Sequence, residues 1–303
     1  MSQIIIITWP LFALILLGFI LKRKNVFPAG FWSGAEKINY FFLFPALLIN
    51  GAATAPLDNP QLLTLSSSVL VILGIASVLL ILLRFLLKWP PRRFGVYVQG
   101  TLRFNTYLGL AITTSIFGSH GVTIAILIIA ILVPMCNVIS VLSLVSDRNN
   151  FSFKSLLLTL IKNPLIIACF IGIFVNLTHI GLPFGSAQFF KHLSSASLPL
   201  GLICIGASLQ MSTLRMEKKA ILVNCAGRLF LMPLLAFSIA VLFGLETLEA
   251  SLLALFFAIP TAPTAYILTR QLNGDSQLMA GIITFQTVIS TITLPVILLI
   301  ATS

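Results

Sequence analysis

The chain has 303 residues, of which 58% are hydrophobic and only 8% are charged, with a mean hydropathy of +1.10 and a formal net charge of +11. Soluble globular domains carry about 25% charged residues, so this composition excludes a soluble domain and indicates a polytopic membrane protein. The basic excess does not indicate nucleic-acid binding, because no soluble basic face is left to present it.

A helix needs about 20 apolar residues to cross the hydrocarbon core of a bilayer. Ten such segments follow one another with short spacers, at residues 4–21, 34–53, 63–87, 96–117, 121–145, 160–178, 194–210, 221–243, 248–269 and 278–301. We therefore expect an all-α integral membrane protein with ten transmembrane helices in the lipid bilayer.

The charges around these segments predict their orientation. The first segment is followed by a basic cluster and has no charge before it, which is not typical of a signal peptide. The loops after spans one, three, five, seven and nine hold thirteen basic residues, whereas the opposite loops hold one, Lys191. The thirteen are Lys22, Arg23, Lys24, Arg84, Lys88, Arg92, Arg93, Arg148, Lys154, Arg215, Lys218, Lys219 and Arg270. By the positive-inside rule, both termini lie outside the cytoplasm.

The two halves of the chain resemble each other. Three positions recur 154 residues later: Pro10, Gly18 and Pro45 as Pro164, Gly172 and Pro199. We expect a first five-helix repeat over residues 1–150 and a second over residues 151–303. Because five is odd, the second repeat inserts upside down, and such inverted repeats are typical of secondary transporters.

Spans four and nine occupy equivalent places in these repeats, and both are interrupted. Span nine contains Pro260 and Pro263, and a proline inside a helix removes a backbone hydrogen bond. Span four, "YVQGTLRFNTYLGLAITTSIFG", carries polar residues and Gly109 at the matching place. We therefore expect two broken helices that cross at the midplane, each leaving a half-helix N-terminus whose amide groups favour an anion.

The predicted site at this crossing is a substrate-binding site with no catalytic group and no cofactor. Arg103 either draws anions to the inner mouth or snorkels to the interface, and both alternatives stay open, whereas for Arg228 we expect snorkelling to the interface. The full set of predicted substrate-binding residues is Asn50, Asn105, Thr106, Tyr107, Gly109, Asn137, Pro260, Thr261, Pro263, Thr264, Tyr266 and Gln286.

Other ionisable residues limit the chemistry. No Asp or Glu lies centrally in a span, and we expect Glu36 to pair with Lys37 at the rim of span two. The missing central carboxylate argues against an acidic-dyad antiporter and against a cation as the main cargo. The four cysteines lie within apolar spans and form no CxxC pair. The three histidines lie in outer loops and lack the spacing of metal ligands. We therefore predict no metal site and no intramembrane enzyme.

At these residues the chain resembles the auxin efflux carrier family of PIN-like bacterial and plant carriers. The resemblance lies in "KINYFFLFPALLINGAA", "RFNTYLGL", "NPLIIACFIGIFVNL", "SASLPLGLICIGASL", "GRLFLMPLLA" and "IPTAPTAYIL". It implies ten spans in two inverted repeats with broken crossing helices four and nine, as in bile-acid-symporter-like folds, and a place in the bacterial inner membrane.

The resemblance also implies export of a small organic anion, auxin-like or a dicarboxylate, with Asn105 and Pro260 as the matching site positions. Family members often have Gly-Leu-Pro in span four where this chain has Gly109-Leu110-Ala111, which leaves the first break to Gly109. A sodium-coupled organic-anion symporter of the same fold and a passive channel are the alternatives. Coupling to sodium or protons and assembly as a homodimer stay open.

Overall fold

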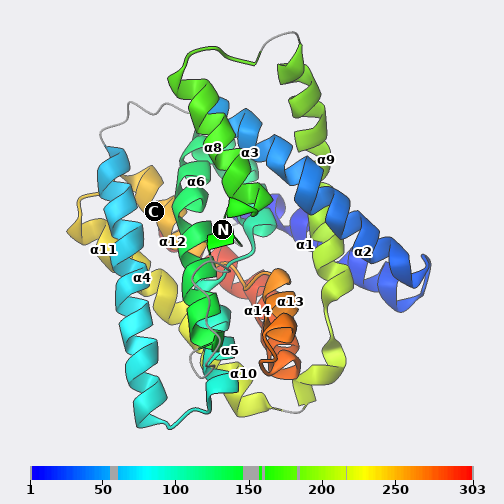
Figure 1. Ribbon diagram of the computed structural model, residues 1–303, viewed down its shortest axis with the longest axis vertical. Coiled ribbons are helices and arrows are strands. Elements are labelled where there is room, and N and C mark those ends of the chain that lie inside the picture. Colours follow the sequence, from blue (N-terminus) through cyan, green and yellow to red (C-terminus); the bar gives the residue numbers. More distant parts are fainter. Residues whose placement is uncertain are drawn as a thin grey trace. The chain divides into compact units, whose positions relative to one another are not determined.

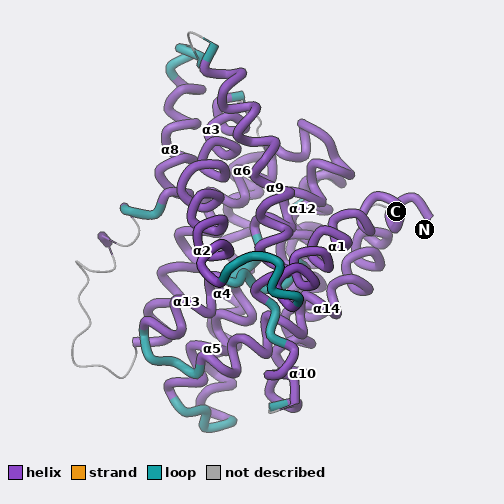
Figure 2. Tube along the Cα trace, turned by 90° about the vertical axis from the view of Figure 1, so that its right-hand side faces the viewer, coloured by secondary structure: helices purple, strands orange, loops and turns teal. Residues whose placement is uncertain are grey.

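The computed structural model describes residues 2–54, 61–145, 157–158, 161–182, 185–215 and 217–301. The predicted boundary between the two halves at residues 150 and 151 lies outside these residues, as do Arg148 and Lys154 of the basic loops. Within the described part the chain consists of helices and the loops that join them, with no strand (Figure 2).

Six helical segments of the described chain are long and apolar enough to cross a membrane. They are Ile4–Arg23, Leu63–Leu86, Arg92–Leu144, Ser186–Ser208, Lys218–Leu242 and Ser276–Ala301. Two shorter apolar helices, Pro164–Leu177 and Thr247–Ala258, fall where spans six and nine were predicted. The segment Arg92–Leu144 covers two predicted spans at once, which is one reason why this number is lower than ten.

The chain forms two compact units, each built from several separate stretches of sequence. Unit 1 comprises Met1–Leu62, Tyr107–Ala130 and Thr159–Ser208, and unit 2 comprises Leu63–Thr106, Ile131–Leu158 and Leu209–Ser303. The long helix α6 (Thr106–Val145) contributes to both units, and its path turns at Gly118, where φ is 60°.

In unit 1, α1 lies against α9 and α3 lies beside α8 (Figure 1). Its remaining elements are helical as well, and the set is α1 (Ser2–Arg23), α2 (Ala29–Ile38), η1 (Asn39–Leu43), α3 (Phe44–Ala53), α8 (Pro164–Leu177) and α9 (Ser186–Ser208). Glycine allows the helix backbones to approach, because a Cβ on Gly18 would lie 1.9 Å from the carbonyl oxygen of Ile203. Small residues of this kind are typical of helix contacts in membranes, where close packing replaces the hydrophobic effect.

In unit 2, the helices are α4 (Gln61–Leu86), α5 (Pro91–Leu102), α10 (Lys218–Ala226), α11 (Met232–Leu242), α12 (Thr247–Ala258), α13 (Thr264–Gln271) and α14 (Ser276–Ala301), with the short turns η2 (Met211–Arg215) and η3 (Gly227–Leu231). An apolar cluster that includes Val96, Tyr97, Ile221, Ala265 and Ile282 joins α5, α10, α13 and α14. At one end of this cluster, a polar network ties the starts of three helices together.

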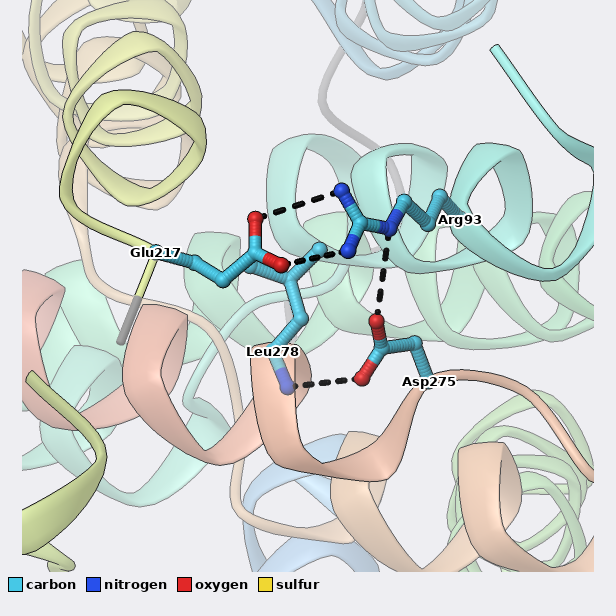
Figure 3. A network of polar contacts seen from close by, with 4 residues as sticks. All are labelled: Arg93, Glu217, Asp275 and Leu278. Atoms are coloured by element: carbon cyan, nitrogen blue, oxygen red, sulfur yellow. Dashed lines mark hydrogen bonds and ion pairs between the residues drawn. The ribbon is translucent and has the colours of Figure 1, made fainter.

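That network centres on Arg93 in the first turn of α5 (Figure 3). The Arg93 guanidinium donates to both carboxylate oxygens of Glu217, which precedes α10, and its Nε lies 3.5 Å from the Asp275 carboxylate, which precedes α14. Asp275 also accepts the amide hydrogen of Leu278 at 3.0 Å and so caps α14. Three helix starts are therefore held at fixed distances from one another.

Two proline-containing helices contain a π turn. The turn η1 precedes Pro45 and η3 precedes Pro233, and in each the amide after the turn bonds to the carbonyl five residues earlier, Phe44 to Asn39 and Met232 to Gly227. A proline clashes with the carbonyl four residues before it, so the wider turn accommodates the proline without ending the helix.

Candidate functional site

The two predicted interruptions lie next to each other in unit 2. Helix α5 ends at Leu102 and α6 begins at Thr106, while α12 ends at Ala258 and α13 begins at Thr264. The backbone amide of Asn105, in the first gap, donates to the carbonyl of Pro260, in the second gap, at 2.8 Å. This hydrogen bond connects the two places where the helical backbone is open.

The local sequence explains the break before α13. The residue before a proline is pushed toward an extended backbone, and Ile259, before Pro260, has φ −68° and ψ 148°. Arg103, at the end of α5, has nearly the same conformation, with φ −71° and ψ 149°. No proline imposes it there.

The expectation that Gly109 makes the first break was wrong. Gly109 lies inside the first turns of α6, and the break comes earlier, at residues 103–105. Tertiary contacts end α5, because the amide of Asn105 and the carbonyls of the last turn of α5 bond to other elements instead of continuing the helix.

Opened helix ends leave carbonyl groups that need partners, since hydrocarbon supplies none. The carbonyl of Gly100 accepts from the Thr261 hydroxyl at 2.8 Å and from Gln286 Nε2 at 2.9 Å. The carbonyl of Leu102 accepts from the Cys136 thiol at 3.2 Å. The last turn of α5 is thus bonded by side chains from α14, from the gap before α13 and from α6.

Arg228 donates hydrogen bonds to carbonyls at both open ends. Its guanidinium donates to the carbonyls of Thr101 at 2.9 Å, Phe256 at 2.8 Å and Ile259 at 2.8 Å, which belong to the ends of α5 and α12. The side chain is 0% exposed, so the expectation that Arg228 snorkels to the interface was wrong. Its position in η3 directs it into the helix ends.

The charge of Arg228 is balanced by these helix ends. A helix C-terminus carries about half a negative charge, so the two ends that Arg228 contacts sum to roughly one negative charge. That sum matches one guanidinium. A carboxylate partner is therefore not required to stabilise this buried cation, although an unpaired charge would be costly in hydrocarbon.

A buried amide network holds the gap before α13 in place. The amide of Thr261 donates to Gln286 Oε1 at 2.8 Å, and Gln286 Nε2 donates to Asn224 Oδ1 at 3.0 Å. Asn224 Nδ2 in turn donates to the carbonyl of Tyr97 and to the Thr101 hydroxyl, both at 3.1 Å. A Cβ on Gly100 would lie 2.3 Å from Asn224 Oδ1, so only glycine allows this approach.

Asn224 and Arg228 were missed as site residues from the sequence. Each is a polar residue in the otherwise apolar stretch "ILVNCAGRLFLMPLL", which was the available signal. A second missed pair is Gln99 and Thr269, joined by a 2.7 Å bond from Gln99 Nε2 to the Thr269 hydroxyl. This bond ties α5 directly to α13.

The new helix starts lie beyond the two gaps. Thr106 opens α6, and Pro263 precedes Thr264, the first residue of α13. Arg103 Nη2 donates to the Thr264 hydroxyl at 3.2 Å, so a second cation lies at the start of α13. Asn105 and Thr261 are buried, whereas Arg103, Pro263 and Thr264 are half-buried.

The other predicted residues are distributed over both units. In unit 2, Tyr266 packs on the apolar cluster of α5, α10 and α14, and Asn137 is half-buried in α6. In unit 1, Tyr107 packs edge-on against Phe44, with ring centroids 4.5 Å apart. Asn50, also in unit 1, lines a cavity there.

The cavity in unit 1 has a volume of about 850 Å³, which is within the range of small-molecule sites. Leu11, Leu14, Leu47, Leu198 and Leu202 form an apolar wall. Its polar lining consists of Asn50, Thr54, Thr114, Ser115, Ser119, His120, Thr123, Lys191, Ser194 and Ser195, which include two basic groups and no acidic one. An amphipathic anion would find both kinds of surface here.

Comparison with known proteins places the chain in a family of membrane transport proteins. Residues 4–298 match the sequence profile of the family described as "Membrane transport protein". The chain is also 27% identical over 290 residues to an uncharacterized transporter of Methanothermobacter thermautotrophicus, an alignment that covers 93% of each chain. The chain therefore belongs to the membrane transport protein family, which is auxin efflux carrier-like, and it is an integral membrane transport protein rather than an enzyme.

Proposed function

We propose that this protein is a secondary carrier that exports a small organic anion across the bacterial inner membrane by alternating access. The observation that carries the proposal is the hydrogen bond between the amide of Asn105 and the carbonyl of Pro260, which joins two interrupted helices. Interrupted helices at equivalent places in two repeats are the best pointer to the binding site of a transporter.

Several paired features support ten spans in two inverted repeats. Helices α5 and α12 each have 12 residues and each end in the same extended conformation. Gly18 and Gly172, which match in the predicted repeat, both lie in close contact with another helix of unit 1, Gly18 with α9 and Gly172 with α3. In the predicted repeat, α1 corresponds to α8 and α9 corresponds to α3. The contact between α1 and α9 therefore has its counterpart in the contact between α8 and α3, as an internal two-fold relation requires.

Charge around the gaps favours an anion. The two half-helix C-termini are already occupied by Arg228, whereas the N-termini of α6 and α13 carry about half a positive charge each. Arg103, beside Thr264, adds a further positive charge. None of the described residues that these hydrogen bonds join is acidic, so the balance at the gap is positive.

We assign the predicted residues to two roles within this proposal. Thr261 and Gln286 form the framework, because their polar atoms are buried and bonded to protein. Those bonds also disfavour the sodium-coupled alternative, in which the same oxygens would hold the ion. We place the substrate contacts of unit 2 at Asn105, Thr106, Pro263, Thr264 and Arg103. Asn50 belongs to a separate group of residues, the lining of the cavity in unit 1.

The test is counterflow in proteoliposomes with the full-length protein. Vesicles loaded with unlabelled malate or indole-3-acetate are diluted into the same labelled anion, and a carrier transiently accumulates the label, whereas a passive channel does not. We expect Asn105→Ala and Pro260→Ala to abolish counterflow while the protein still inserts and purifies. Gln271→Ala, at the exposed end of α13, is the control. Unchanged counterflow in both variants would remove the site assignment.

A further inference from the structure

One acidic side chain faces the interior of unit 1. Glu36 lies about two turns into α2, on the same side as Trp32 and Asn39, which are 8% and 1% exposed. Residues three and four apart share a helix face. On the other side of this segment, Ile38 and Phe42 are exposed and apolar, as expected of a surface toward lipid.

Glu36 forms no ion pair with any residue that the structure describes. The predicted pair with Lys37 is not formed: the ion pairs among the described residues lie at Arg93, and Lys37 is exposed. Consecutive helical residues point in different directions, which explains why the two charges do not meet. Among the described residues, Tyr107 on α6 and Cys204 on α9 lie within electrostatic reach of Glu36, and both are neutral weak acids.

A buried hydrogen-bond donor three residues after Glu36 has no acceptor in the described part of the chain. Asn39 is held in the π turn η1 by the Ser197 hydroxyl, which donates to Asn39 Oδ1 at 3.0 Å. Its Nδ2 group is buried and makes no hydrogen bond to the residues that the structure describes. An unsatisfied buried donor costs about 1–3 kcal/mol, and such groups call for a functional explanation.

Close packing keeps this donor in place. A Cβ on Gly201 would lie 2.8 Å from Asn39 Nδ2 and 2.8 Å from the Tyr107 ring, so both groups abut the bare backbone of α9. Asn39 therefore cannot relieve its unpaired group by turning away. π turns of this kind are frequent at functional sites.

We propose that Glu36 is a proton-binding site that couples the transport cycle to the proton gradient. Its carboxylate takes a proton from water, forming a neutral carboxyl group, and returns it to water when the surroundings open. Desolvation disfavours the charged form of a carboxyl group, so its proton occupancy depends on how far water reaches α2. Asn39, three residues further along the same face, keeps its buried Nδ2 group next to Gly201 of α9. Coupling by this site rests on the proposed carrier function.

Infrared spectroscopy tests proton binding without any substrate. The pH-difference spectrum of the full-length protein in liposomes should contain C=O stretches of protonated carboxyl groups, and Glu36→Gln should remove the band that belongs to Glu36. Glu246→Gln, which alters an exposed carboxylate before α12, should leave that band unchanged. A band of full size in Glu36→Gln would overturn the proposal.

Transport under a pH gradient tests the coupling. Malate and indole-3-acetate fluxes are measured with and without an imposed gradient, with the membrane potential clamped by potassium and valinomycin and the leak of protein-free liposomes subtracted. We expect the pH gradient to change the wild-type flux several-fold. In Glu36→Gln, the ratio of the flux with the gradient to the flux without it should fall to unity, and counterflow at equal pH should be retained. An equal response in wild type and variant would overturn the coupling. Absence of any wild-type counterflow would instead count against the carrier function, and the infrared result would still decide whether Glu36 binds a proton.

Discussion

The buried guanidinium of Arg228 offers the sharpest test of how the two interrupted helices are held. Arg228→Met keeps an apolar side chain of similar length but leaves the carbonyls of Thr101, Phe256 and Ile259 without donors. Each buried carbonyl left unsatisfied costs about 1–3 kcal/mol, which sums to roughly 3–9 kcal/mol for three. The variant no longer buries a charge, and that gain offsets part of the loss.

The net effect should resemble the removal of one partner from a buried ion pair, a loss of about 3–5 kcal/mol. At about 2–4 °C for each kcal/mol in chains of comparable size, the melting temperature should fall by roughly 10 °C. The melting temperature of Arg228→Lys should lie between those of the wild type and Arg228→Met, because a single ammonium group cannot reproduce the planar guanidinium that bonds to three carbonyls.

The assay is thermal unfolding of the purified protein in detergent, followed by intrinsic fluorescence. Arg23→Met, at the exposed end of α1, provides the control for loss of one positive charge. If Arg228→Met melts at the same temperature as the wild type, Arg228 does not stabilise the two helix ends. The same conclusion follows if the melting temperature falls by the same amount in Arg228→Met as in Arg23→Met.

Two further predictions concern packing and surface charge. Gly18→Ala should destabilise the protein by about 1–3 kcal/mol, because the new methyl group would overlap the carbonyl of Ile203. The control is Gly34→Ala, which has open space around it and should not destabilise the protein. Equal melting temperatures for the two variants would contradict the close contact of α1 and α9. Arg93→Gln should cost only about 1 kcal/mol, because the Arg93 side chain is 36% exposed, and the difference from wild type should shrink in high salt. A salt-independent difference in melting temperature would show that the Arg93 network acts through packing rather than charge.

The sequence alone determined the class of the protein. Its hydropathy and length leave no alternative to a membrane-embedded helical chain, and its motifs predicted the transport family that the comparisons then showed. The place of the second interruption was also predictable, because Pro260 acts on the residue directly before it. These are local effects, and local sequence is sufficient to specify them.

Only the tertiary structure decided how the interruptions are held. Gly109 looked like the first break, yet α5 ends earlier because its carbonyls bond to Arg228, Thr261 and Gln286 from distant parts of the chain. Arg228 looked like a snorkelling cation, and Glu36 like half of a rim pair with Lys37. In each case the sequence shows the polar group but not its partner. The partner depends on which helix ends and side chains pack against that group in the folded protein, and in a membrane no water can take their place.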